Sequence, residues 1–261
     1  MPRIRVHDIE LYYEDVGQGP ALLLIHGLGS STRDWEKQIV DLSRHFRVIM
    51  FDVRGHGRSD KPPGPYSVPL FATDTAELLK SLGIGSAHVV GISMGGMIAF
   101  QLAVSAPDLV QSLVIVNSGP ELIVRTVRER IQVLQRQLIV QLLGMRRMGE
   151  VLGRRLFPKP EQTDLRTMFA ERWAENDPRA YRDALQALIG WSVADQLSDI
   201  NCPTLVIAAD TDYTPVSLKE AFVAKMPHAK LAVIRDARHA VPVERPEQFN
   251  EVLSEFLLQH T

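Results

Sequence analysis

The sequence has 261 residues, of which 45% are hydrophobic and 23% charged, so the chain can bury a sizeable core as one large domain or as a domain with an insertion. Its formal net charge of -2 argues against a general nucleic-acid binder, because such proteins are basic. The single cysteine, Cys202, excludes an internal disulfide and a metal site built from several cysteines. No segment resembles a signal peptide or a membrane span, so we expect a cytoplasmic protein. We also expect that it uses no cofactor and no metal ion.

Short apolar runs alternate with helical segments along most of the chain. Residues 3–15 alternate as two short strands, and six runs rich in Val, Ile and Leu follow at 21–25, 47–51, 88–92, 113–117, 204–209 and 231–235. Nearly continuous apolar runs of this length are typical of strands buried on both faces of a parallel sheet. Segments with helical spacing lie at 32–45, 69–83, 94–106, 217–226 and 245–259. The alternation predicts an α/β fold with a mostly parallel central sheet flanked by helices.

One interval interrupts this alternation. Between Pro120 and Leu197 no convincing strand is present, and apolar residues recur at helical spacing. We therefore expect a helical cap, residues 120–197, inserted after the sixth strand into a core domain formed by residues 1–119 and 198–261. Such an insertion leaves the sheet at the carboxyl ends of its strands, where open α/β sheets bind ligands, so it can act as a lid.

A Gly-x-Ser-x-Gly sequence lies at Gly91, Ser93 and Gly95. The motif alone is moderate evidence, since it arises by chance in roughly one such chain in fifteen. Here it follows a strand-like run and precedes a helix-like one, as a sharp strand-to-helix turn requires. The glycines allow close backbone approach in that turn. Ser93 would project from the amino end of a helix, where negative charge is stabilised, and is our candidate nucleophile.

A serine hydroxyl is a weak nucleophile and needs a base and an acid that orients the base. His239 follows the last predicted strand and therefore lies at the same sheet edge as Ser93, so we take it as the base. Enzymes built on this motif carry the acid between the serine and the histidine in the chain. Asp210 and Asp212 both follow the strand at 204–209. Spacing alone leaves both aspartates open.

An oxyanion formed at Ser93 would need two preorganised N–H donors. The backbone of Met94, the residue after the serine, can supply one. The other fits the sequence HGLG at 26–29, because its glycines let the backbone approach a ligand closely, and Leu28 N–H is the expected donor. We expect a structural hydrogen-bonding role for His26, since no second ligand lies at metal-site spacing.

These segments together resemble the α/β-hydrolase fold superfamily over nearly the whole chain. The resemblance rests on HGLG (26–29), Trp35, FDVRGHGRSDKP (51–62), GISMGG (91–96), AADTDYTPV (208–216) and RHAVPVERPEQFN (238–250). It implies that Asp52, Arg54 and His56 belong to a structural loop beside the site. In that superfamily the acid usually falls three residues after a glycine that ends the strand. Ala209 stands in the place of that glycine, which points to Asp212.

Members of that superfamily that act on haloalkanes or epoxides carry an aspartate where this chain has Ser93, so the resemblance disfavours those activities. The segments KPPGPYSV and GISMGGMIAFQLA look like the 3-oxoadipate enol-lactonase branch. We therefore expect a carboxylic ester hydrolase that cleaves a small ester or lactone through Ser93, His239, Asp212 and an acyl-enzyme intermediate. A carbon–carbon bond hydrolase, a cofactor-free haloperoxidase and a receptor-like ligand sensor with slow turnover remain alternatives.

The first part of the predicted cap is basic. Nine basic residues accompany three acidic ones there: Arg125, Arg128, Arg130, Arg136, Arg146, Arg147, Arg154, Arg155 and Lys159 against Glu121, Glu129 and Glu150. The simplest interpretation is the solvated face of amphipathic helices. A sharper one is that one arginine faces the site and pairs with a carboxylate on the substrate. Contact with an anionic membrane is a third interpretation.

Overall fold

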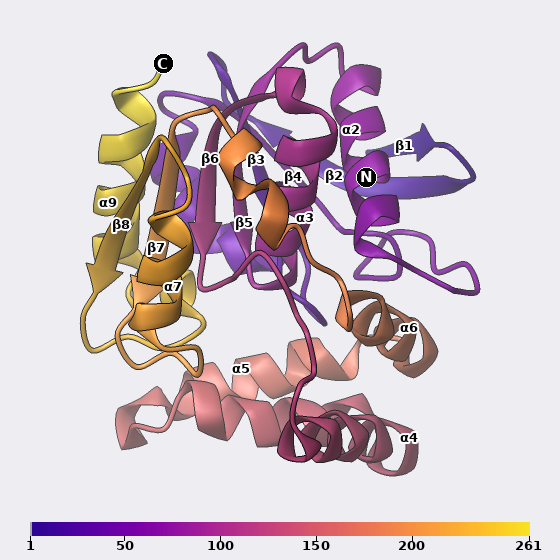
Figure 1. Ribbon diagram of the computed structural model, residues 1–261. Helices are drawn as coiled ribbons and strands as arrows, with labels where there is room; N and C mark the ends of the chain where they lie inside the picture. The colour runs from indigo at the N-terminus through magenta and orange to yellow at the C-terminus, as the bar shows by residue number, and fades with distance from the viewer. Residues whose placement is uncertain (1) are drawn as a thin grey trace.

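In the computed structural model, which describes residues 2–261, eight strands form one sheet in the order β1-β2-β4-β3-β5-β6-β7-β8 (Figure 1). The six strands β4-β3-β5-β6-β7-β8 are parallel to one another, whereas β2 is antiparallel to both β1 and β4. The mostly parallel sheet expected from the sequence is confirmed. The strands are β1 (Arg3–Val6), β2 (Ile9–Val16), β3 (Ala21–Ile25), β4 (Arg47–Phe51), β5 (Ala87–Ile92), β6 (Val110–Val116), β7 (Thr204–Ala209) and β8 (Ala229–Ile234).

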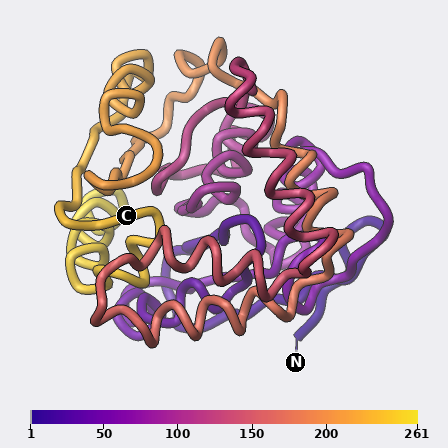
Figure 2. The backbone as a smooth tube through the Cα atoms, turned by 90° about the horizontal axis from the view of Figure 1, so that it is seen from below, coloured from indigo at the N-terminus to yellow at the C-terminus, as the bar shows by residue number. Residues whose placement is uncertain are grey.

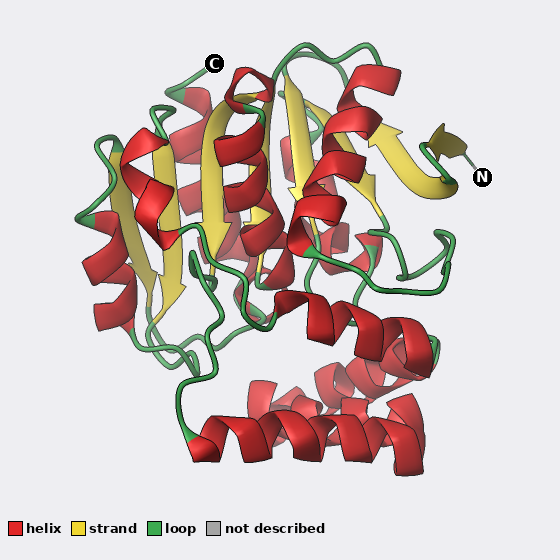
Figure 3. Ribbon diagram, turned by 45° about the vertical axis from the view of Figure 1, so that its right-hand side comes forward, coloured by secondary structure: helices red, strands yellow, loops and turns green. Residues whose placement is uncertain are grey.

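Helices cover both faces of this sheet (Figure 3). Successive side chains of a strand point to opposite faces, so in β3 Leu23 and Ile25 join one core cluster while Leu22 and Leu24 join the other. The first cluster includes side chains of α2 (Val68–Ser81), α3 (Met94–Ser105) and α7 (Val216–Val223), and the second includes side chains of α1 (Glu36–Leu42) and α9 (Pro246–Leu258). Burial on both faces explains why the strands read as nearly continuous apolar runs.

The helical segments expected in the core domain are present, with two differences at their ends. The segment at 32–45 begins as a 3-10 helix, Thr32–Trp35, and continues as α1. The last segment is preceded by a separate short helix, α8 (Val241–Glu244), and α9 then starts at Pro246. A proline at the first position of a helix is favourable, because the missing N–H would have no partner there.

Three helices between β6 and β7 form a cap below the sheet, at the carboxyl ends of the strands (Figures 1 and 2). They are α4 (Val127–Leu156), α5 (Thr163–Ala174) and α6 (Pro178–Leu188). A capping box starts α4, in which the side chains of Thr126 and Glu129 each accept the other's backbone N–H. Gly144 leaves the helical conformation at φ 78° and ψ 177°, so α4 consists of two arms joined at this glycine. The expected cap after the sixth strand is confirmed.

The cap has a small core of its own: Val140, Met145, Met148, Trp173, Tyr181 and Leu185. Six apolar residues recur at helical spacing along α4. Five of them, in its first arm, are 43–72% exposed, whereas the sixth, Met145, lies in the core of the cap: Val127, Ile131, Leu134, Leu138 and Leu142 are the exposed ones. The spacing therefore identified the helix correctly, although most of this apolar series stays in solvent.

Some residues of the expected cap range pack into the core of the sheet instead. Trp191, Val193 and Leu197 belong to the same core cluster as α2 and α3, and a 3-10 helix, Ala194–Asp199, precedes β7. The division into a core of 1–119 and 198–261 and a cap of 120–197 therefore stays a prediction. Within residues 2–261, no helix is at once long and apolar enough to span a bilayer.

Candidate active site

Ser93 forms the turn between β5 and α3 in an unusual backbone conformation. Its φ of 55° and ψ of -117° lie outside the regions that non-glycine residues ordinarily occupy. Hydrogen bonds to neighbouring residues stabilise this backbone conformation. Ser93 N–H donates to Val116 in β6, and Ser93 C=O accepts hydrogen bonds from Gly96 N–H and from the hydroxyl of Ser118 at 2.6 Å. A strained residue held this firmly is typical of a functional position.

The glycines on either side of Ser93 allow three backbone segments to meet. A Cβ on Gly95 would overlap the carbonyl oxygens of Ile25 and His26, at the end of β3. A Cβ on Gly91 would overlap the backbone of Gly95 itself. Both positions require glycine because of close approach, and this packing brings the start of α3 against the HGLG segment.

The HGLG segment lies beside the serine. A Cβ on Gly27 would be 3.5 Å from Cβ of Ser93. Within residues 2–261, the backbone N–H groups of Leu28 and Met94 donate to no acceptor, although both flank the serine. Two free N–H donors next to a nucleophile can bind a developing oxyanion. The geometry is thus compatible with the donors expected from the sequence.

His26 orders this segment as a neutral side chain. Val53 N–H donates to its Nε2 at 2.9 Å, so the proton resides on Nδ1, which lies 2.8 Å from the carbonyl oxygen of Gly27. Complete burial lowers the pKa of His26 to about 4, against a smaller opposite effect of the Gly27 hydrogen bond. His26 therefore fixes the conformation of Gly27 and has no nitrogen left for a metal.

His239 and Asp212 form a direct contact. Nδ1 of His239 lies 2.8 Å from Oδ1 of Asp212, whose side chain is fully buried. The other oxygen, Oδ2, accepts hydrogen bonds from Lys219 Nζ at 2.8 Å and from the Thr214 hydroxyl at 2.5 Å. Asp210 is exposed, and within residues 2–261 its side chain accepts only the backbone N–H of Ala237, at 3.3 Å. Of the two aspartates that the sequence leaves open, Asp212 is the one that reaches the histidine.

The contacts of Asp212 keep its carboxylate ionised. Burial by itself would raise the pKa of Asp212, but the hydrogen bonds and charge of His239 and the hydrogen bonds from Lys219 and Thr214 outweigh it and hold the pKa at about 2. Lys219 is itself only 1% exposed, so the pair is a buried ion pair. An ionised Asp212 can orient the His239 ring and stabilise its protonated form.

The hydroxyl of Tyr213 is hydrogen-bonded to the second ring nitrogen of His239. The Tyr213 hydroxyl lies 2.5 Å from Nε2, and the two rings stack with centres 4.1 Å apart. Desolvation of its hydroxyl, followed by the charge of Asp212, raises the pKa of Tyr213, although the residue as a whole is 59% exposed. In residues 2–261 no hydrogen bond joins Ser93 directly to His239. No motif in the sequence singles out Tyr213.

Asn117 is a second residue that the motifs do not identify. It follows β6 at φ 43°, and its side chain donates to the carbonyl oxygens of Arg238 and His239 and accepts Ala209 N–H at 2.8 Å. One amide therefore links the end of β7, which precedes Asp212, to the loop of His239. A polar residue directly after a buried strand is the only signal in the sequence.

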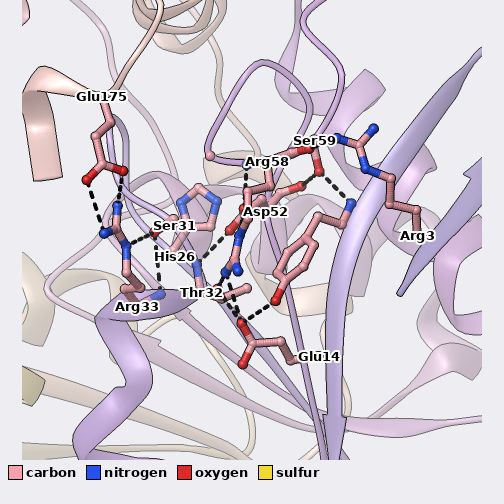
Figure 4. A network of polar contacts seen from close by, with 12 residues as sticks. Arg3, Glu14, His26, Ser31, Thr32, Arg33, Asp52, Arg58, Ser59 and Glu175 are labelled. Atoms are coloured by element: carbon pink, nitrogen blue, oxygen red, sulfur yellow. Dashed lines mark hydrogen bonds and ion pairs between the residues drawn. The ribbon is translucent and has the colours of Figure 1, made fainter. Parts of the chain in front are cut away.

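The loop after β4 lies beside His26 of the HGLG segment (Figure 4). Asp52 is buried, and its oxygens accept the backbone N–H groups of Thr32 and Arg58, each at 2.7 Å. Arg54 forms a buried ion pair with Asp74 at 2.7 Å. His56 is buried against His26, and this burial lowers the pKa of His56 to about 3. These contacts are structural, as the resemblance implied for this loop.

The cap is fastened to the HGLG segment by the end of α5. Arg33 pairs with Glu175 at 2.5 Å (Figure 4). Asn176 Nδ2 donates to Gly29 C=O at 2.8 Å. A Cβ on Gly29, whose φ is 75°, would lie only 2.9 Å from the Trp173 ring. The cap therefore touches the loop that carries the Leu28 donor.

The comparisons with known proteins agree with this architecture. The sequence profile described as alpha/beta hydrolase fold matches residues 20–246. The provisionally named carbamate hydrolase RutD of Azorhizobium caulinodans is 31% identical, over 98% of this chain and 98% of the relative. The 3-oxoadipate enol-lactonase 2 of Acinetobacter baylyi is 29% identical, over 96% and 94% of the two chains.

Solved structures show the same likeness. The enol-lactonase of Burkholderia xenovorans LB400 has a TM-score of 0.92 at 25% identity, over 98% of this chain and 100% of the other. A thermophilic esterase of Thermogutta terrifontis has a TM-score of 0.91 at 27% identity, over 100% and 99%. With a family profile that matches most of the chain and a full-length relative above 30% identity, the chain is a hydrolase that belongs to the α/β hydrolase fold family.

Proposed function

We propose that the protein hydrolyses a carboxylic ester or lactone, with Ser93 as the nucleophile, His239 as the base and Asp212 as the acid that orients the base. The observation that carries the proposal is the 2.8 Å contact between His239 and the buried Asp212, together with a serine held at φ 55° in the turn after β5. The names of relatives support the substrate class, since they include enol-lactonases and an esterase.

The reaction begins when Ser93 Oγ attacks the carbonyl carbon of the substrate and its proton passes to Nε2 of His239. The Tyr213 hydroxyl has to leave Nε2 before this transfer, because both hydroxyls use the same lone pair. Asp212 accepts the hydrogen bond from Nδ1–H and stabilises the positive charge that His239 acquires. The N–H groups of Leu28 and Met94 stabilise the negative charge on the carbonyl oxygen.

The tetrahedral intermediate then breaks down. His239 gives its proton to the leaving alcohol oxygen, the carbon–oxygen bond of the ester breaks, and the acyl group remains on Ser93. A water molecule attacks this acyl-enzyme while His239 takes one of its protons and returns it to Ser93 Oγ. The products are a carboxylic acid and an alcohol, which stay on one molecule when the substrate is a lactone.

The test is the variant Ser93→Ala on a short-chain p-nitrophenyl ester. We expect turnover to fall by several orders of magnitude, because the nucleophile is lost. The matched control is Ser105→Ala, which removes a hydroxyl at the far end of the same helix and should leave turnover unchanged. Thermal unfolding of both variants checks that the fold is intact.

The same pair of variants should be run on a panel of esters, lactones, carbamates and ring-cleavage products. A carbamate belongs in the panel because relatives carry that name and because its carbonyl can be attacked by the same steps. Near-normal ester turnover by Ser93→Ala would refute the assignment. Binding of a panel compound with negligible turnover by the unmodified protein would favour the ligand-sensor alternative.

A further inference from the structure

The basic residues of the cap do not all have the same surroundings. Seven of the nine are exposed: Arg125, Arg128, Arg130, Arg146, Arg147, Arg154 and Arg155. Lys159 is partly buried and pairs with Asp236 at 2.6 Å. The remaining residue, Arg136, is partly buried, and no carboxylate within residues 2–261 pairs with it. Arg136 is therefore a cation held partly out of water without an acidic partner in the described chain.

Arg136 lies on the inner side of α4. It precedes Val140 by one helical turn, and Val140 is 1% exposed in the core of the cap. Arg136 Nε donates to the Tyr181 hydroxyl. The guanidinium carbon lies 5.4 Å from the centre of the Tyr181 ring and 6.0 Å from that of Trp173. Two buried aromatic rings thus hold the guanidinium under the cap, and Nη1 and Nη2 have no acceptor in residues 2–261.

The same rings locate Arg136 relative to the nucleophile. Trp173 and Tyr181 lie 2.9 and 3.1 Å from the position of a Cβ on Gly29, and Leu28 packs against the core of the cap. Arg136 therefore lies against the two rings that pack on the loop of the Leu28 donor.

We propose that Arg136 binds a carboxylate on the substrate, so that the site takes esters or lactones that carry a second, ionised carboxyl group. The inference rests on the proposed ester or lactone hydrolysis and names its substrate class. A guanidinium offers two parallel N–H donors that match a carboxylate. Removing a cation from water is unfavourable unless a partner compensates, and a substrate carboxylate supplies that partner.

The binding test uses the Ser93→Ala protein, which keeps the site but cannot turn over the ligand. The probes are the monomethyl esters of succinate, glutarate and adipate, each compared with its neutral dimethyl ester by calorimetry. We expect at least one half-ester to bind about 10- to 100-fold more tightly than its diester, the range that a charge-assisted hydrogen-bonded pair contributes. Adding Arg136→Gln should abolish this difference and leave the affinity for the diester unchanged.

Two further variants separate charge from packing. Arg146→Gln removes an equal charge from the outer side of α4 and should leave the difference intact. Tyr181→Phe removes the hydroxyl that holds Nε but keeps the charge of Arg136, and should retain most of the difference. The unaltered affinity for the diester shows that Arg136→Gln still folds. The proposal would be overturned if half-ester and diester bind with equal affinity or if neither binds. It would also be overturned if the difference in affinity persists in Arg136→Gln.

Turnover gives a separate readout in protein that retains Ser93. We expect kcat/KM to be higher for the half-ester than for the diester, and Arg136→Gln to lower kcat/KM for the half-ester alone. Ester turnover that does not depend on Ser93 would refute the proposed hydrolysis. The binding comparison would still decide the role of Arg136. An equal effect of Arg136→Gln on both esters would refute the carboxylate contact and leave the hydrolysis intact.

Discussion

The hydroxyl of Tyr213 lies 2.5 Å from Nε2 of His239, on the ring nitrogen opposite the one that Asp212 holds. The phenol thus occupies the ring nitrogen through which the proposed base would accept a proton. A substrate that approaches Ser93 meets a histidine whose lone pair is already engaged.

Tyr213→Phe removes this competing hydroxyl and keeps the stacked ring. A typical hydrogen bond contributes about 1 kcal/mol net, so we expect kcat/KM for a small ester to rise about five-fold. Steady-state kinetics of the variant and the unmodified protein measure the effect. Tyr13→Phe, which removes a phenol hydroxyl from β2, is the matched control. A fall in kcat for Tyr213→Phe would show instead that the hydroxyl assists the reaction.

The ionisation of Asp212 makes the stability of the fold depend on pH. Its pKa of about 2 in the folded chain lies below the ordinary value of 3.8. A carboxylate with a depressed pKa stabilises the folded state fully above its unfolded pKa, and this stabilisation is lost as the pH falls through the folded pKa. The shift corresponds to about 2 kcal/mol, lost between about pH 4 and pH 2.

Urea unfolding of the unmodified protein and of Asp212→Asn at a series of pH values measures this contribution. Asparagine does not titrate, so the difference in unfolding free energy between the two proteins should shrink by about 2 kcal/mol from pH 4 to pH 2. A difference that stays constant over this range would mean that the Asp212 carboxylate is not depressed in the folded state.

Lys219 is the buried cation that accompanies this carboxylate, at 2.8 Å from Oδ2. Lys219→Met leaves a buried charge with one partner fewer, so we expect the free energy of unfolding at pH 7 to fall by about 3 kcal/mol. The double variant Lys219→Met/Asp212→Asn should recover part of this loss, because it removes both charges. Lys225→Met, at an exposed position just after α7, should change the stability by less than about 0.5 kcal/mol. Equal losses of unfolding free energy in Lys219→Met and Lys225→Met would argue against a buried ion pair between Lys219 and Asp212.

Gly95 is packed against the end of β3 more closely than any side chain allows. Gly95→Ala gains about 1 kcal/mol of helix propensity, but its Cβ overlaps two carbonyl oxygens, and overpacking of this kind costs about 1–3 kcal/mol or more. We expect a net loss of about 2 kcal/mol in the free energy of unfolding. Gly85→Ala, where no heavy atom lies within 4 Å of the added Cβ, should have little effect on urea unfolding. Similar stability of the two variants would contradict the close packing at the Ser93 turn.

The order of elements predicted much of the site. Parallel strands bring their carboxyl ends to one edge, so Ser93 after β5 and His239 after β8 could be expected to meet. The choice between Asp210 and Asp212 needed the turn after β7, in which Asp212 N–H donates to Ala209 C=O and folds the chain back toward the histidine. Spacing along a strand carries no information about that turn.

The sequence did not identify Tyr213, and it named Arg136 only as one of nine basic cap residues, in both cases for physical reasons. Tyr213 is an aromatic residue in a loop, and its place depends on a side-chain conformation that no periodicity reports. Arg136 is one of several arginines on a helix whose clearest apolar stripe, Val127 to Leu142, is exposed. The stripe pointed to the outer side, so only the packing of Val140, Trp173 and Tyr181 distinguishes Arg136 from its neighbours.

The amide of Asn117 links the end of β7, just before Asp212, to the loop of His239, which is 27 residues further along the chain than Asp212. Asn117 also lies three residues before Pro120, where the chain leaves the sheet toward the cap. Opening of the cap would therefore pull on a residue anchored to β7 and to the histidine loop together. Asp212 and His239 would then move together. The distance between them would stay the same even when a movement of the cap changes the distance of both residues from a bound substrate.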